Sequence, residues 1–168
     1  MTVAIGLTNP KFARNVAAVI RSASCYEVPT VLWSGRRVTD ELAKASRLPR
    51  EERMKGYANV QTTITNRMFD HTRGLIPVAI ELVPGAECLI EFEHPENAFY
   101  VFGPEDGSLS RADLGQCYKF VKIPTAHCLN LATAVSTVLY DRHAKRVARG
   151  LEVPYGGVNG YHGEEAVG

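Results

Sequence analysis

Residues 98–110, AFYVFGPEDGSLS, decide how the rest of the chain is interpreted. The first five are apolar on both faces of an extended strand, which is typical of a central strand in a parallel sheet. Gly103 then allows a ligand to approach the backbone, and Pro104 fixes φ and removes a donor. The SRAD that starts at Ser110 resembles a capping box that opens a helix. A plain strand–turn–helix connection explains all of this except Glu105, which follows the strand at the edge where open α/β sheets bind ligands.

Short apolar runs alternate with stretches of helical periodicity along the chain. We expect strands at 3–7, 30–34, 76–82, 97–103 and 118–124, a weaker strand at 59–65, and helices at 15–26, 38–47, 85–91, 110–116 and 131–149. Such alternation predicts an α/β fold with a mostly parallel sheet and helices on both faces.

The pattern divides the chain into one domain and a tail. Residues 1–149 form the expected domain, and residues 150–168 hold six of the 14 glycines without any periodicity. The composition of this tail is typical of a loop or a frayed terminus. The alternative is an arm in which Tyr155 and Tyr161 become ordered against a partner.

Composition excludes several classes of protein. The chain has 168 residues and a net charge of only +1, so it has no overall positive field that would attract nucleic acid. Any surface that binds nucleic acid must therefore be a local basic patch. The four cysteines form no CxxC pair, which favours free thiols in a reducing cytosol over a zinc site or a disulfide framework. No stretch approaches the ~20 apolar residues of a membrane span. We therefore predict a cytoplasmic protein that binds neither membrane nor metal.

A second informative stretch is NVAAVIRSA, residues 15–23. Its apolar residues recur at helical spacing and predict a buried stripe. Asn15 stands where an N-cap belongs. Arg21 points away from the stripe and has small neighbours one turn away on either side, which leaves room for a ligand. A solvated arginine on an ordinary helix is the alternative.

The third stretch is IPTAHCLNLATAV, residues 123–135. Ile123 ends a strand, and Asn130 is a second candidate N-cap before the last helix. His127 and Cys128 lie in the loop between them. We do not expect a Cys–His nucleophile here, because adjacent loop residues rarely form a working dyad and no third partner is evident.

The order of these three stretches resembles the SpoU-type branch of the SPOUT RNA methyltransferases, over about residues 3–149. NVAAVIRSA is similar to the first motif of that family, FGPEDGSLS to the second and IPTAHCLNLATAV to the third. The resemblance implies S-adenosylmethionine as the methyl donor and the 2′-hydroxyl of an RNA ribose as the acceptor. It also implies a deep trefoil knot in the C-terminal half and a homodimer. Transfer RNA is the first expected substrate and ribosomal RNA the second.

The same resemblance implies a set of site residues. The implied catalytic residues are Arg21, Asn15, Glu105 and Asn130, and the implied cofactor-binding residues are Glu81, Leu82, Gly103, Ile123, Cys128, Leu129 and Asn130. Glu105 is expected to orient the side chain of Asn15 or Arg21, or the substrate ribose. Arg21 stays protonated, so we favour a role in phosphate binding and in stabilising charge on the 2′-oxygen over a role as general base.

Two departures from the family pattern stand out: Cys128 replaces the usual serine before LN, and Ala17 replaces a glycine. The first keeps open a rival hypothesis, a catalytically inactive knotted protein that binds RNA or cofactor. A Rossmann-type enzyme is excluded, because no GxGxxG follows the first strand. The expected RNA contacts are basic residues in 36–55 and in the last helix: Arg36, Arg37, Lys44, Arg47, Arg50, Arg53, Lys55, Arg142, Lys145, Arg146 and Arg149.

Overall fold

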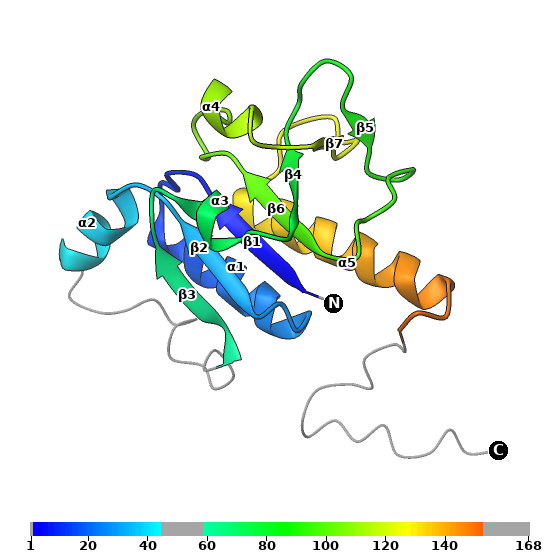
Figure 1. The fold of residues 1–168 in the computed structure, drawn as a ribbon. Coiled ribbons are helices and arrows are strands. Elements are labelled where there is room, and N and C mark those ends of the chain that lie inside the picture. The colour runs from blue at the N-terminus through cyan, green and yellow to red at the C-terminus, as the bar shows by residue number, and fades with distance from the viewer. Residues whose placement is uncertain (1, 45–58, 153–168) are drawn as a thin grey trace.

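The computed structural model describes residues 2–44 and 59–152, and these build one seven-stranded sheet in the order β3-β2-β1-β6-β4-β7-β5 (Figure 1). All of its strand pairings are parallel. The strands are β1 (Val3–Leu7), β2 (Thr30–Trp33), β3 (Gln61–Ile64), β4 (Ile76–Ile80), β5 (Glu87–Cys88), β6 (Ala98–Phe102) and β7 (Lys119–Lys122). The predicted parallel α/β sheet is thus confirmed.

Helices cover both faces of this sheet, as expected. They are α1 (Ala13–Cys25), α2 (Arg37–Lys44), α3 (Met68–His71), α4 (Arg111–Leu114) and α5 (Leu131–Ala148). Apolar residues of α1 and α5 pack in one core with alternate residues of the central strands, and Figure 1 shows the two helices along the same face. A smaller core on the opposite face includes Met68 of α3 and Leu109 and Cys117 on either side of α4.

The central strand β6 fixes where the chain's loops meet. All five of its residues are buried, and it pairs with β1 on one side and β4 on the other. Leu7 at the end of β1 and Ile80 at the end of β4 both pair with Phe102, the last residue of β6. The loops that follow these three strands therefore leave the sheet at the same edge.

The basic residues of α5 hold a segment of the same chain instead of facing solvent as a group. The guanidinium of Arg142, which is 5% exposed, donates to the carbonyl oxygens of Pro95 and Glu96 at 2.6 and 2.9 Å. Lys145 donates to the carbonyl oxygens of Leu89 and Phe92. Residues 89–96 are thereby fastened along the C-terminal half of α5.

The last two basic residues of α5 pair with the same segment. Arg146 contacts Glu96, and Arg149 contacts Glu93. The expectation that the cations of α5 contact RNA phosphates is therefore wrong for the buried Arg142, and the other three each have a partner within the chain. Arg47, Arg50, Arg53 and Lys55 lie outside the described residues.

One expected helix is absent from the described ranges. In place of a helix at 85–91 the chain forms turns around the short strand β5, which pairs with β7 through Glu87 and Cys88. Ala86 and Leu89 are both buried here, and Leu89 packs in the core that contains the apolar residues of α5. Pairing with a distant strand here overrides local periodicity.

Neither membrane spans nor metal clusters were found in the part of the chain that the structure describes. None of the helices there has the length and apolar character to cross a bilayer. Within the same ranges, no three His, Cys, Asp or Glu side chains gather around a common point where a cation would be held.

Candidate active site

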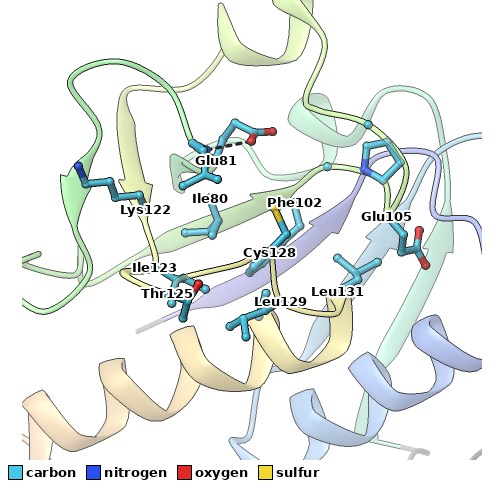
Figure 2. Close-up of a pocket in the computed structure, with 15 residues that line it drawn as sticks. Ile80, Glu81, Phe102, Glu105, Lys122, Ile123, Thr125, Cys128, Leu129 and Leu131 are labelled. Carbon is cyan, nitrogen blue, oxygen red and sulfur yellow. Dashed lines mark hydrogen bonds between the residues drawn. The ribbon is translucent and has the colours of Figure 1, made fainter.

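A hollow of about 170 Å³ opens at the edge where β4 and β6 end, against the first turn of α5 (Figure 2). Its wall is mainly apolar and comes from Ile80, Leu82, Phe102, Ile123, Leu129 and Leu131. Three charged side chains also line it: Glu81, Glu105 and Lys122. Figure 2 shows Glu81 on the β4 side of the hollow and Glu105 on the opposite side.

Glu81 fastens the loop after β6 to the end of β4. One carboxylate oxygen accepts from the amide of Leu82 and the other from the amide of Leu109, each at 2.9 Å. Gly103 favours this return of the chain, because a Cβ at this position would lie 3.1 Å from the nitrogen of Leu109. Any side chain here would make the loop move by a few tenths of an ångström, so the glycine suits the loop's own close approach, apart from any ligand.

Glu105 connects the same loop to the start of α1. Its two carboxylate oxygens accept from the backbone amide of Lys11 at 2.7 Å and from Nδ2 of Asn15 at 2.6 Å. The predicted N-cap role of Asn15 is wrong: α1 begins at Ala13, and Phe12 is its N-cap without a side-chain bond. Asn15 lies inside the first turn, 6% exposed, with its amide directed to Glu105.

Asn130 completes the connection to α5. Its Oδ1 accepts from the amides of Ala132 and Thr133, so the predicted N-cap is confirmed. Its Nδ2 donates to Oδ1 of Asn15 at 3.1 Å. A chain of hydrogen bonds thus runs from Glu105 through Asn15 to Asn130, and it fixes the orientation of both amides.

A second carboxylate of the loop is bound by cations from earlier in the chain. Asp106 accepts two hydrogen bonds from Arg37, at 3.0 and 2.8 Å, and lies 3.3 Å from Nζ of Lys11. The bond from Arg37, with a smaller contribution from Lys11, lowers the pKa of Asp106 to about 2. The loop after β6 is therefore held by acidic contacts at Glu81, Glu105 and Asp106.

Most of the predicted site residues meet at this hollow. Seven line it: Glu81, Leu82, Gly103, Glu105, Ile123, Cys128 and Leu129. Asn15 and Asn130 reach it through Glu105. Arg21 is exposed on α1 and does not line the hollow; it stands six residues beyond Asn15, about 9 Å farther along the helix axis.

Sequence reasoning missed Lys122 and Thr125 in the wall of the hollow and the cluster of Asp106 with Arg37. Asp106 stood out only as part of the stretch 98–110, and Arg37 only as one of several basic residues. Their contact joins positions 69 residues apart, so no local pattern could have indicated it. The signal that the sequence did offer was the pair of adjacent acidic residues, Glu105 and Asp106, shortly after a buried strand.

Comparison with known proteins places the chain in a family. The profile of the SpoU rRNA Methylase family matches residues 2–140. A search of curated proteins found no match.

Solved structures of low sequence identity share the fold. AviRb, a SpoU methyltransferase from Streptomyces viridochromogenes, has 19% identity and a TM-score of 0.72, with 88% of this chain and 61% of that chain covered. The A. aeolicus TrmH/SpoU tRNA modifying enzyme has 18% identity and a TM-score of 0.72, with 89% and 77% covered. A structure described as giving insights into 2-OH methylation of C/U34 on tRNA has 22% identity and a TM-score of 0.68, with 89% and 97% covered.

AviRb has also been solved in complex with AdoMet, and that complex has 19% identity to this chain and a TM-score of 0.69. The present chain spans 61% of AviRb. The family profile covers most of the sequence, including the two motif stretches that line the hollow and the stretch around Asn15 that is bonded to them. The chain therefore belongs to the SpoU rRNA Methylase family.

Proposed function

We propose that this protein is an S-adenosylmethionine-dependent methyltransferase that modifies a ribose 2′-hydroxyl of RNA, with transfer RNA as the first candidate and ribosomal RNA as the second. The observation that carries the proposal is that two of the motif stretches line one hollow, while the first stretch is joined to it by the hydrogen bonds of Asn15 with Glu105 and Asn130. The structures similar to this chain include a tRNA modifying enzyme and an rRNA methyltransferase. The trefoil knot and the homodimer are parts of the same proposal.

The chemistry of the hollow fits this cofactor. Its apolar wall suits an adenine ring, and ordered carboxylates suit ribose hydroxyls and positive charge. Glu81 is well prepared for this, since both of its oxygens are already oriented by backbone amides. Ile123 and Leu129 line the wall, and their main-chain groups would contact the adenine. When bound, the cofactor supplies a methyl group activated by its attachment to a sulfonium.

The chain's own residues would place and polarise the acceptor. Glu105 accepts from the backbone amide of Lys11 and from the side chain of Asn15, so it orients these groups. The ordered amides of Asn15 and Asn130 stand next to the hollow and offer fixed dipoles. Arg21 does not line the hollow of its own chain, so in this proposal the dimer would bring it to the acceptor, where its guanidinium would bind an adjacent phosphate and stabilise negative charge on the attacking oxygen.

A homodimer agrees with the outer surface of α1 and α5. Tyr140 on α5 is 63% exposed, and Arg21 and Cys25 are exposed on the neighbouring α1. An aromatic side chain on a surface of this kind is common at protein interfaces. Light scattering at micromolar concentration tests the assembly, and a monomer would contradict it.

The function is tested by incubating the protein with total RNA and methyl-labelled cofactor, followed by mapping of the labelled nucleotide. We expect the label at one nucleotide. The phosphodiester on the 3′ side of that nucleotide should resist alkaline cleavage, because its 2′-hydroxyl is methylated. Arg21→Ala should retain binding of S-adenosylhomocysteine in calorimetry and lose transfer. The matched control is Arg73→Ala, which removes an arginine that is 81% exposed and bound to Asp70. Cofactor binding without transfer by the wild-type protein would instead indicate a binding protein, and no cofactor binding would refute the proposal.

A further inference from the structure

Two adjacent arginines at the start of α2 have different surroundings. The side chain of Arg36, the residue just before α2, is 88% exposed, and its ion pair is with Asp40 of that helix at 3.8 Å. The side chain of Arg37 is 32% exposed and binds Asp106 through both terminal nitrogens. Arg37 also donates to the carbonyl oxygen of Asn9 at 3.4 Å.

The partner of Arg37 is the residue next to Glu105. Asp106 and Glu105 leave the loop together, and both contact the segment that leads into α1: Asp106 lies against the side chain of Lys11, and Glu105 accepts from its backbone amide. A shift of Asp106 would therefore move Glu105 and, through it, the amide of Asn15.

Helix α2 contacts the same region at a second point. Glu41, one turn after Arg37, accepts from the backbone amide of Ala13 at 2.6 Å, which is the first residue of α1. An anionic side chain at a helix N-terminus is favourable. Helix α2 thus holds both the loop after β6 and the start of α1, although it contributes no residue to the wall of the hollow.

We propose that Arg37 is a positioning residue, which acts through Asp106 to hold Glu105 and Asn15 in the orientation that methyl transfer needs. The alternative is that Arg37 contacts an RNA phosphate, as basic residues at such an edge often do. The geometry favours positioning, because the planar guanidinium already meets a carboxylate in the two-bond arrangement to which it is best suited. The role in transfer rests on the proposed function, but the structural link does not.

The first experiment tests the link without cofactor or RNA. The side-chain amide of Asn15 is followed by nitrogen–proton correlation NMR in the wild type and in Arg37→Ala, Asp106→Asn and Glu105→Gln. The last variant removes the charged acceptor and gives the reference position for a weakened bond. We expect Arg37→Ala and Asp106→Asn to shift the Asn15 resonance toward that reference.

The control for the link is Arg67→Ala, because Arg67 also pairs with an aspartate, Asp70, just before a helix, without contact to the loop after β6. It should leave the Asn15 resonance in place. An Asn15 resonance that is unchanged in Arg37→Ala and Asp106→Asn would overturn the proposal, whatever the enzyme's activity. If Arg37→Ala does not fold, Asp106→Asn decides the same question with a side chain of nearly equal shape.

The second experiment separates positioning from phosphate binding by the rate of label transfer to total RNA. Loss of positioning should lower the maximal rate in Arg37→Ala by about tenfold. The RNA concentration at half-maximal rate should change less than twofold. Arg36→Ala removes an equal charge from the neighbouring position. It should change only the RNA concentration at half-maximal rate and leave the maximal rate unchanged.

A rise in the half-maximal RNA concentration for Arg37→Ala, with the maximal rate retained, would show phosphate binding and refute the positioning role. Arg37→Lys keeps the charge without the two-bond geometry, so it should recover little of the rate. A wild-type protein that transfers no label would count against the proposed function instead, and the Asn15 resonance would then still decide the structural link.

Discussion

Acid should destabilise this protein through one buried histidine. The side chain of His94 is 3% exposed, with Nδ1 2.6 Å from the hydroxyl of Tyr100 and Nε2 2.8 Å from Asp141. Burial, with smaller contributions from the charges of Arg142 and Lys145 and against the opposing effect of Asp141, lowers the pKa of His94 from 6.5 to about 4. The imidazole is therefore neutral in the folded protein at neutral pH.

The size of the effect follows from the difference between the two pKa values. The unfolded chain binds a proton at this imidazole near pH 6.5, whereas the folded chain binds it only near pH 4. Stability is therefore complete above pH 6.5 and is lost as the pH falls toward 4. A difference of about 2.5 pKa units corresponds to about 3 kcal/mol, a large part of the ~5–15 kcal/mol that stabilises a typical domain.

The assay is equilibrium unfolding in urea, from about pH 7.5 down to about pH 4, for the wild type and for His94→Gln. The variant loses hydrogen bonds and should be less stable at neutral pH. Because it lacks the titrating group, the gap in unfolding free energy should narrow by up to about 3 kcal/mol in acid.

The difference in unfolding free energy between the wild type and His94→Gln at each pH removes the contributions of other groups that titrate over the same range. His127→Asn removes an exposed imidazole outside this cluster and should follow the wild type. A gap between wild type and His94→Gln that stays constant from neutral to acid pH would refute the argument, because it would mean that His94 binds its proton equally well in both states.

Three further substitutions test contacts around the hollow and α5. Gly103→Ala places a Cβ 3.1 Å from the nitrogen of Leu109. S-adenosylhomocysteine should therefore bind about tenfold more weakly in calorimetry. Unchanged binding would show that the loop can move at no cost. Asn130→Ala removes the cap of α5 and should lower the unfolding free energy by about 1 kcal/mol. Asn130→Asp keeps the oxygen that accepts the capping bonds, so it should recover most of the lost stability in thermal melts. Arg142→Leu leaves the carbonyl groups of Pro95 and Glu96 without their donor, the first of them buried, and should cost about 3 kcal/mol in urea unfolding. The exposed Arg149→Leu should cost less than about 1 kcal/mol, and equal costs would contradict this account.

Much of the fold was predictable because local signals and tertiary structure agree. The apolar run before Gly103 is the central strand β6, and Asn130 caps the last helix as its position suggested. Ser110 caps α4 by accepting from the amide of Asp113. For the two caps one short stretch contains both the signal and its partner, and for β6 the apolar run itself is the signal.

The failures have the opposite character, since each depends on a partner far along the chain. Asn15 is a residue type favoured at N-caps, yet its side-chain amide donates to Glu105, 90 residues away. The segment around Glu87 forms a strand only because β7 lies beside it. The order of the strands and the contact of Arg37 with Asp106 likewise depend on which segments meet in space.

The fastening of residues 89–96 has a consequence for how this sequence can vary. Arg142 and Lys145 bind main-chain oxygens there, and every amino acid carries such an oxygen. Side chains in this segment can therefore be exchanged during evolution with little loss of these bonds, provided that the backbone keeps its course. The two cations have no such freedom, so substitutions should accumulate in the segment and be rare at the helix positions that grip it.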